Sequence, residues 1–201
     1  MKKDSLLFIV CAPSGAGKTT LCKEIIKSLP DLIFSVSCTT RAPRTCEIEG
    51  KDYFFVRKEQ FLEMRDAGEF AEWSVVFDNY YGTKFSFIER AKTEGKDIVF
   101  DIDVNGAKQL KAVYPDGIGI FITPPSFNEL ENRLKKRGTE SFDKIKRRLQ
   151  IATEELMEME KFEYIVINGD FDRAVADFKS IIKSQRCRKE YILPMVKESL
   201  F

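Results

Sequence analysis

Histidine is absent from this chain of 201 residues. Every mechanism that uses an imidazole as base, nucleophile or metal ligand is therefore excluded, whereas phosphoryl transfer, which depends chiefly on positioning and charge neutralisation, is not. The five cysteines are widely spaced and contain no Cys-x-x-Cys pair, so neither a disulfide framework nor a zinc site is expected. These features predict a reduced, cytoplasmic compartment.

Long apolar runs are missing too, and no segment approaches the length of a membrane-spanning helix. The formal net charge is only +1, so no long-range field favours nucleic acid or an anionic membrane as a partner. Hydrophobic residues make up 43% of the chain and charged residues 32%, a balance typical of a well-solvated protein with a substantial core. We expect one globular unit, and nothing in the sequence predicts its oligomeric state.

Apolar strand patterns alternate with helical patterns along the whole chain. This alternation predicts an α/β fold, in which a mostly parallel sheet lies between layers of helices. Short strands and many polar groups between about residues 37 and 95 predict a subdomain inserted into that core, and a single terminal helix is expected around residues 174–182. The expected strands and extended segments are residues 6–11, 35–38, 53–56, 98–101, 118–122 and 164–167.

The most informative segment is Ala12-Pro13-Ser14-Gly15-Ala16-Gly17-Lys18-Thr19. It lies between an apolar strand and an amphipathic helix, the order in which a phosphate-binding loop occurs. Consecutive backbone N–H groups of such a loop point at an anion. Lys18 is expected to reach the β and γ phosphates of a nucleotide, and the Thr19 hydroxyl to help hold Mg²⁺.

The first position of this loop departs from the usual pattern, because it is Ala12 rather than glycine. Alanine is compatible with the loop provided that φ stays negative there, while Gly15 and Gly17 are expected where the backbone is crowded. The alternative interpretation is a glycine-rich turn that contains a lysine by chance.

A second candidate anion site is the basic loop that contains Arg41 and Arg44. The two arginines flank Ala42-Pro43, and the proline restricts the backbone before it to extended forms. Two guanidinium groups three residues apart on a stiff loop suit one phosphate, which they can bind with forked, charge-assisted hydrogen bonds. A solvated basic turn is the alternative.

Together these segments resemble the guanylate kinases, which phosphorylate GMP with ATP. The resemblance spans essentially the whole chain, and its motifs occur in the family's order. They are residues 12–19, Ser37-Cys38-Thr39-Thr40-Arg41-Ala42-Pro43-Arg44, Gly50-Lys51-Asp52-Tyr53, Asn79-Tyr80-Tyr81-Gly82-Thr83, Asp101-Ile102-Asp103 and residues 133–140.

The resemblance implies a role for each matching residue. Glu72 would accept hydrogen bonds from N1 and N2 of guanine, Ser37 would serve O6, and Asp101 would lie near Mg²⁺ through water. Catalysis would depend on Lys18, Arg41, Arg137 and Arg148. The implied ATP-binding residues are Ala12, Pro13, Ser14, Gly15, Ala16, Gly17, Lys18, Thr19, Thr20, Arg133, Arg137 and Asn168. The implied GMP-binding residues are Ser37, Arg41, Arg44, Tyr53, Glu72, Tyr81, Thr83, Asp101 and Asp103, of which Arg41, Arg44, Tyr53 and Tyr81 would bind the phosphate.

Structural alternatives remain for several of these residues. Glu72 is interpreted alternatively as an ordinary surface carboxylate, Asp101 and Asp103 as helix caps, and the arginines of residues 133–148 as part of a solvated charged helix.

The implied organisation is one domain with three parts. The core comprises about residues 1–36, 96–126 and 160–201, the GMP-binding subdomain residues 37–95, and a small helical lid residues 127–159. The implied reaction converts ATP and GMP, or dGMP, into ADP and the nucleoside diphosphate. Two alternatives stay open at this point: an inactive module of the same fold that binds phosphopeptides, and a kinase for another small phosphate acceptor.

Overall fold

We describe the protein from a computed structural model, in which residues 5–136 and 142–200 are described. The strands of this part of the chain form two sheets. In chain order the elements are β1 (Leu7–Cys11), α1 (Lys18–Ser28), β2 (Leu32–Phe34), β3 (Ser37–Thr39), β4 (Tyr53–Phe55), α2 (Lys58–Asp66), β5 (Phe70–Val76), β6 (Asn79–Lys84), α3 (Phe85–Thr93), β7 (Asp97–Asp101), α4 (Val104–Val113), β8 (Ile118–Thr123), α5 (Phe127–Lys136), α6 (Phe142–Met157), the short 3₁₀ helix η1 (Glu158–Lys161), β9 (Tyr164–Ile167), α7 (Phe171–Arg186) and α8 (Lys189–Leu200).

The main sheet is parallel and has the strand order β2-β7-β1-β8-β9. Every residue of the central strand β1 is buried. Because side chains alternate along a strand, Phe8 and Val10 enter the core on one face of the sheet, while Leu7 and Ile9 enter the core on the other. A strand buried on both faces requires helices on both sides.

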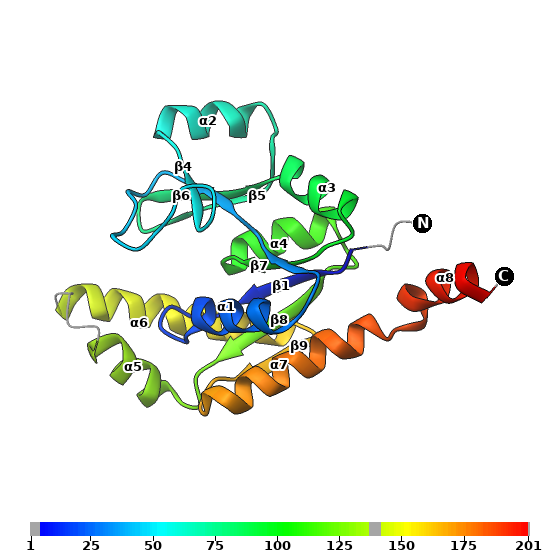
Figure 1. Ribbon diagram of the computed structural model, residues 1–201. Coiled ribbons are helices and arrows are strands. Elements are labelled where there is room, and N and C mark those ends of the chain that lie inside the picture. Colours follow the sequence, from blue (N-terminus) through cyan, green and yellow to red (C-terminus); the bar gives the residue numbers. More distant parts are fainter. Residues whose placement is uncertain (1–4, 137–141, 201) are drawn as a thin grey trace.

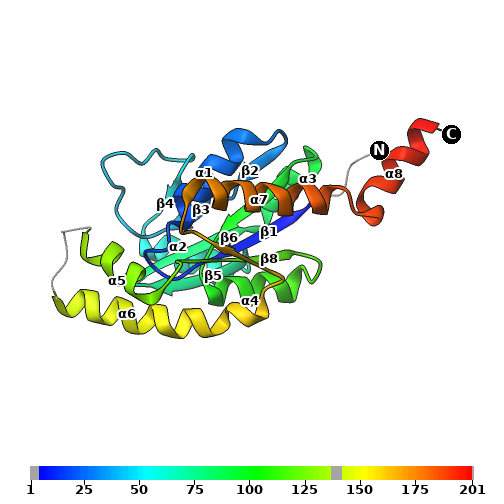
Figure 2. The ribbon, with the colours of Figure 1, turned by 90° about the horizontal axis from the view of Figure 1, so that it is seen from below.

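Helices do cover both faces of this sheet (Figure 2). Apolar residues of α1 and α7 pack on the face that carries Phe8 and Val10. Residues of α3 and α4 pack on the opposite face. The predicted α/β core with a mostly parallel sheet between helices is thus confirmed.

The second sheet has the order β4-β3-β6-β5 and lies to one side of the core, under α2 (Figure 1). Strands β5 and β6 are antiparallel and join through Phe77 and Asp78, whose φ angles of 47° and 67° are those of a two-residue hairpin turn. Strand β5, at one edge of the second sheet, lies against α4 of the core. This contact brings the second sheet to the carboxyl ends of the core strands.

The end of the chain differs from the single terminal helix that the sequence predicts, because a second helix, α8, follows α7 and projects from the core (Figure 1). Arg186, at the end of α7, forms an ion pair with the fully buried Asp97, with 2.7 Å between Nε and Oδ2. The Tyr191 hydroxyl of α8 donates to the other oxygen of Asp97 at 2.9 Å. Within the described ranges no helix has the length and apolarity needed to span a bilayer.

Candidate functional site

The loop between β1 and α1 has the backbone that its glycines predict. Gly15 and Gly17 have φ angles of +99° and +88°, a region that other residues rarely adopt. A Cβ at Gly17 would also lie 2.5 Å from Nδ2 of Asn168. Ala12 is not among the residues with positive φ, so the expectation that alanine fits the first position is confirmed.

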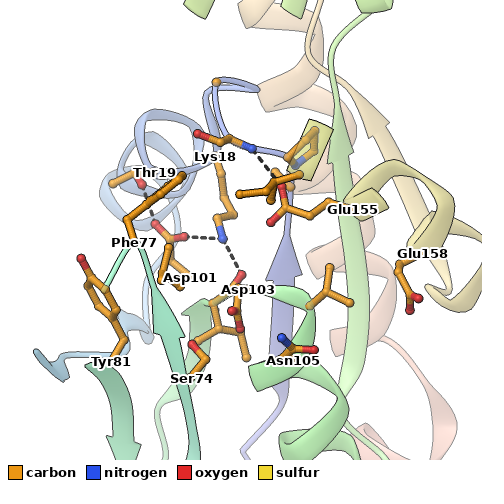
Figure 3. Close-up of a pocket in the computed structure, with 18 of the residues that line it drawn as sticks. Lys18, Thr19, Ser74, Phe77, Tyr81, Asp101, Asp103, Asn105, Glu155 and Glu158 are labelled. Atoms are coloured by element: carbon orange, nitrogen blue, oxygen red, sulfur yellow. Dashed lines mark hydrogen bonds and ion pairs between the residues drawn. The ribbon is translucent and has the colours of Figure 1, made fainter. Parts of the chain in front are cut away.

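Lys18, at the start of α1, points back along the loop toward the carboxyl end of β7 (Figure 3). Its Nζ lies 2.8 Å from Oδ1 of Asp101 and also donates to the carbonyl of Ile102. Burial lowers the pKa of Lys18, but the Asp101 carboxylate and other neighbouring groups together raise it by more, so the net pKa lies above its ordinary value. Lys18 is therefore a fixed positive charge at the base of the loop.

Asp101 joins the lysine to the next residue of α1. Its second oxygen, Oδ2, accepts a hydrogen bond from the Thr19 hydroxyl at 2.6 Å. Asp101 is the last residue of β7 and pairs in register with Val10 of β1, so the parallel register places it directly beside the loop. The described residues thus bring together the three predicted groups Lys18, Thr19 and Asp101.

Behind the loop lie Asn168 and Arg133. The Asn168 side chain donates to the carbonyl of Ala16 at 2.7 Å, and Nη2 of Arg133 donates to the carbonyl of Asn168 at 2.9 Å. Arg133 Nε is paired with Glu129 at 2.9 Å. Both predicted ATP-binding residues therefore support the loop from outside, and their contact with ATP stays a prediction.

The remaining arginines predicted to act in catalysis lie on the segment after α5. Arg137 lies outside the described residues. The guanidinium carbon of Arg148, on α6, lies 5.0 Å from the centre of the Phe77 ring at the β5–β6 turn. Arg148 thus contacts the tip of the second sheet, and its role in catalysis stays a prediction.

Glu155, which the sequence analysis missed, lies seven residues after Arg148 on α6. Its Oε2 accepts a hydrogen bond from the backbone N–H of Ser14 at 3.2 Å (Figure 3). Burial raises the pKa of Glu155. The Glu155 carboxylate therefore accepts a hydrogen bond from one of the backbone N–H groups that the loop would otherwise offer to a bound anion.

Glu72 of β5 is a buried carboxylate, exposed by only 2%. Its Oε1 has no hydrogen-bond partner among the described residues. The pKa of Glu72 is raised from 4.5 to about 7, mainly by burial and also by the nearby Asp103, against a lowering by hydrogen bonds from Thr83. The alternative interpretation of Glu72 as a surface carboxylate is wrong.

Two hydroxyl groups and a second carboxylate lie around Glu72. The Ser37 and Thr83 hydroxyls are hydrogen-bonded to each other at 3.0 Å, and both residues are buried. Asp103 caps α4 by accepting from the backbone N–H of Gly106 at 2.8 Å, so the helix-cap interpretation of Asp103 is confirmed. Strands β3, β5 and β6 thus bring together Ser37, Glu72 and Thr83.

The basic loop is organised by an acidic residue, Glu47. Nη2 of Arg41 lies 2.7 Å from Oε1 of Glu47, and the backbone N–H of Arg44 donates to Oε2 at 2.8 Å. Nε of Arg41 donates to the Tyr81 hydroxyl at 3.2 Å, and its guanidinium lies 5.4 Å from the Tyr53 ring centre. Burial raises the pKa of Tyr53 to about 12, so this phenol stays a hydrogen-bond donor.

One cavity of about 590 Å³ connects the two candidate sites (Figure 3). Its lining runs from Lys18 and Thr19 past Asp101 to Tyr81 and Glu72. A ligand at the loop and a ligand at Glu72 would therefore share one cavity, which is partly open to solvent. This arrangement suits the direct transfer of a group between two bound molecules.

A family model described as guanylate kinase matches residues 4–185. The chain belongs to the guanylate kinase family. The match covers the phosphate loop, the basic loop and Glu72, so the identification made from these motifs is confirmed.

Curated members of this family match along almost their full length. The guanylate kinase of Geobacter metallireducens is 48% identical over 198 residues, which cover 98% of each chain. That of Caldanaerobacter subterraneus subsp. tengcongensis is 46% identical over 204 residues, covering 100% of this chain and 99% of the relative. The crystal structure of guanylate kinase from Anaplasma phagocytophilum superposes with a TM-score of 0.78 at 28% identity, covering 100% and 97% of the two chains.

Proposed function

We propose that this protein transfers the γ-phosphoryl group of ATP to GMP and dGMP, giving ADP and the corresponding diphosphate. One observation carries the proposal: a single cavity is lined both by the phosphate loop with Lys18 and by Glu72, whose buried Oε1 has no hydrogen-bond partner in the described part of the chain. The intact loop also argues against an inactive phosphopeptide-binding module. A phosphopeptide in the GMP groove would not require a second, separate phosphate-binding loop with Lys18 and Thr19.

ATP binds at the loop in this proposal. Its phosphates accept hydrogen bonds from backbone N–H groups of residues 14–19, and Lys18 contacts the β and γ phosphates. The Thr19 hydroxyl and the Asp101 carboxylate supply adjacent hard oxygen atoms, a donor set that fits Mg²⁺ held mainly by phosphates and water. When bound, Mg²⁺ neutralises charge on the phosphate oxygens.

GMP binds on the side of the second sheet. Glu72 accepts from N1–H and N2–H₂ of guanine, because a carboxylate offers two acceptor oxygens to these two donors. The Ser37 hydroxyl, which is hydrogen-bonded to Thr83, donates a hydrogen bond to O6 of guanine. Arg41 and Tyr81 lie together where they can bind the phosphate.

The reaction needs no general base, because the attacking oxygen of the GMP phosphate is already anionic. Lys18 and Arg41 stabilise the negative charge that spreads over the transferred group, and Arg137 and Arg148 approach from the lid. We assign residues 37–95 to the GMP-binding subdomain and residues 127–159 to the lid. Closure of both parts on the core would exclude water from the cavity. A cytoplasmic location remains part of the proposal.

A panel of acceptors tests this function directly. With ATP as donor and GMP, dGMP, AMP, UMP and dTMP as acceptors, kcat/KM for GMP is expected to exceed that for AMP by roughly 10⁴, because adenine would leave the Glu72 carboxylate desolvated and unpaired. The measurement is initial-rate formation of ADP. Comparable turnover of AMP or of a pyrimidine nucleotide would contradict the proposed acceptor.

Glu155 provides a second test, directed at the ATP side. A carboxylate on the Ser14 amide repels the phosphates of an incoming nucleotide, so Glu155→Gln is expected to lower the Kd for ATP by about threefold to tenfold. Isothermal titration measures the change. Glu154→Gln is the matched control, because Glu154 lines the same cavity but is exposed. Weaker ATP binding by Glu155→Gln would show instead that Glu155 supports the loop.

A further inference from the structure

The first turns of α4 form the wall against which the Glu72 carboxylate lies. We propose that Gly106 and Gln109 are positioning residues that fix Glu72 in the place where it selects guanine. This inference rests on the proposed role of Glu72 in binding GMP. Neither residue needs to touch the nucleotide, since each acts on β5 or on the Glu72 side chain.

Gly106 leaves the space that the carboxylate occupies. A Cβ built at Gly106 would lie 2.5 Å from Oε2 of Glu72 and 3.2 Å from Oδ1 of Asp103. Non-bonded atoms do not approach that closely, so a side chain at position 106 would displace the Glu72 carboxylate, which is otherwise held in place and exposed by only 2%. The side chain at position 106 therefore decides where the carboxylate lies.

The backbone at Gly106 does not itself require glycine. Gly106 is inside α4 and its φ is not positive, whereas a glycine inside a helix lowers helix stability by up to about 1 kcal/mol relative to alanine. Local helix propensity thus favours alanine at this position, and the approach of Glu72 is what excludes it.

Gln109 fixes the strand that carries Glu72. Its Nε2 donates to the carbonyl of Trp73 at 2.6 Å, and its Oε1 accepts from the N–H of Trp73 at 3.1 Å. One side-chain amide therefore pairs with both backbone groups of the residue directly after Glu72, as a neighbouring strand would.

This pairing matters because strand pairing alone holds β5 weakly at this point. Strand β5 is at the edge of its sheet, and its ladder with β6 shifts register between Phe70 and Glu72. Such an irregularity bends a strand and changes the direction of its side chains. Gln109 fixes the strand from the other side, just beyond the irregularity.

Gly106→Ala tests the spatial part of the inference. We expect KM for GMP to rise at least about tenfold, the effect of disturbing one hydrogen bond to a charged group, while KM for ATP stays within about twofold. The ratio of kcat/KM for GMP to that for AMP falls, which a purely structural role would not produce.

Gly119→Ala is the matched control for this variant. A Cβ at Gly119 would lie 2.5 Å from Oε2 of Glu163, a carboxylate that is exposed and paired with Lys111. The same kind of clash therefore occurs away from the cavity, and we expect KM for GMP to be unchanged even where stability falls. An equal rise in KM for both variants would overturn the inference.

Gln109→Met tests the second part, because methionine keeps the length of the side chain and removes both hydrogen bonds. KM for GMP is expected to rise by about threefold to tenfold, with KM for ATP unchanged. Lys111→Met on the same helix is the control. If Gln109→Met and Gly106→Ala both leave KM for GMP and the GMP preference unchanged, α4 does not position Glu72.

A double-mutant cycle separates failure of this inference from failure of the proposed function. If Glu72→Ala alone leaves KM for GMP unchanged, the role of Glu72 in guanine binding is wrong. If Glu72→Ala raises KM, Gly106→Ala is expected to add nothing in the Glu72→Ala background, because the atoms it displaces are gone. Additive effects would show that Gly106 acts elsewhere.

Discussion

Glu72→Gln is expected to lower kcat/KM for GMP by about 10²-fold to 10⁴-fold while making the ligand-free protein more stable at pH 8. Both effects have one cause. Glu72 is buried, and its Oε1 accepts no hydrogen bond from residues 5–136 and 142–200, an arrangement that costs folding free energy until guanine supplies the missing donors. Glutamine removes the charge but offers guanine one acceptor and one opposing donor, and sites built around such a hydrogen bond reject a mismatch by large factors.

The pH dependence of stability gives the sign of this effect. Burial raises the pKa of Glu72 from 4.5 to about 7, so the folded protein binds the proton more tightly than the unfolded chain does. The penalty for ionised Glu72 is absent well below pH 4.5, develops between pH 4.5 and 7, and is complete above about pH 7, where it reaches about 3 kcal/mol.

Denaturant unfolding at pH 5 and pH 8 measures this penalty. We expect Glu72→Gln to raise the free energy of unfolding at pH 8 by about 1–3 kcal/mol, since burial of the amide offsets part of the gain, and by much less at pH 5. Glu154→Gln, a change of the same charge at an exposed position, serves as the control. A variant that is less stable than the parent at pH 8 would refute the assignment of Glu72 as a destabilised buried carboxylate.

Lys18→Met is expected to lower turnover by at least about 10³-fold, because the charge that develops on the transferred phosphoryl group loses its fixed partner. The variant also leaves Asp101 without its ion pair at 2.8 Å, and an uncompensated, nearly buried carboxylate destabilises the fold. Circular dichroism and thermal unfolding must therefore accompany the rate measurement.

Two further variants separate stability from catalysis. Lys18→Met combined with Asp101→Asn removes the uncompensated charge, so stability is expected to recover while turnover stays low. Lys23→Met changes an exposed lysine of the same helix, and its turnover is expected to stay near that of the parent. Turnover of Lys18→Met near the parent level, with the fold intact, would mean that the proposed mechanism is wrong.

Local sequence predicted the core well, because its signals are strong over short distances. The run of apolar residues in β1, the two glycines and the helix after Lys18 define strand, loop and helix without tertiary information. Strand β2 was missed because Leu32–Phe34 is only three residues long and follows Pro30 and Asp31, the latter with φ of 58°. The break between α7 and α8 was missed because neither glycine nor proline marks it.

The residues of the candidate site also divide into those that sequence motifs indicate and those that the sequence alone does not reveal. Ser37, Glu72 and Thr83 were placed by a resemblance of motifs, and their burial in one region agrees with that placement. Glu155 and Gln109 were not found, since each acts through a contact that only the folded chain creates. Glu47 was also missed, although its partners Arg44 and Arg41 lie only three and six residues before it. Glu155 meets Ser14 across 141 positions of sequence, and no periodicity or spacing reports such a pair. The one available signal was the spacing of seven residues between Arg148 and Glu155, which places both on one face of a helix.

Three small residues of the phosphate loop, Ala12, Gly15 and Gly17, lie at positions that differ in the side chains they tolerate. Gly15 and Gly17 have backbone angles that side chains disfavour, and a methyl group at Gly17 would collide with Asn168. Position 12 has neither restriction. A search pattern that requires glycine at the first position would miss this chain, although nothing in the loop structure depends on glycine there. Gly15 and Gly17 are the more diagnostic residues for recognising such a loop in newly sequenced genomes.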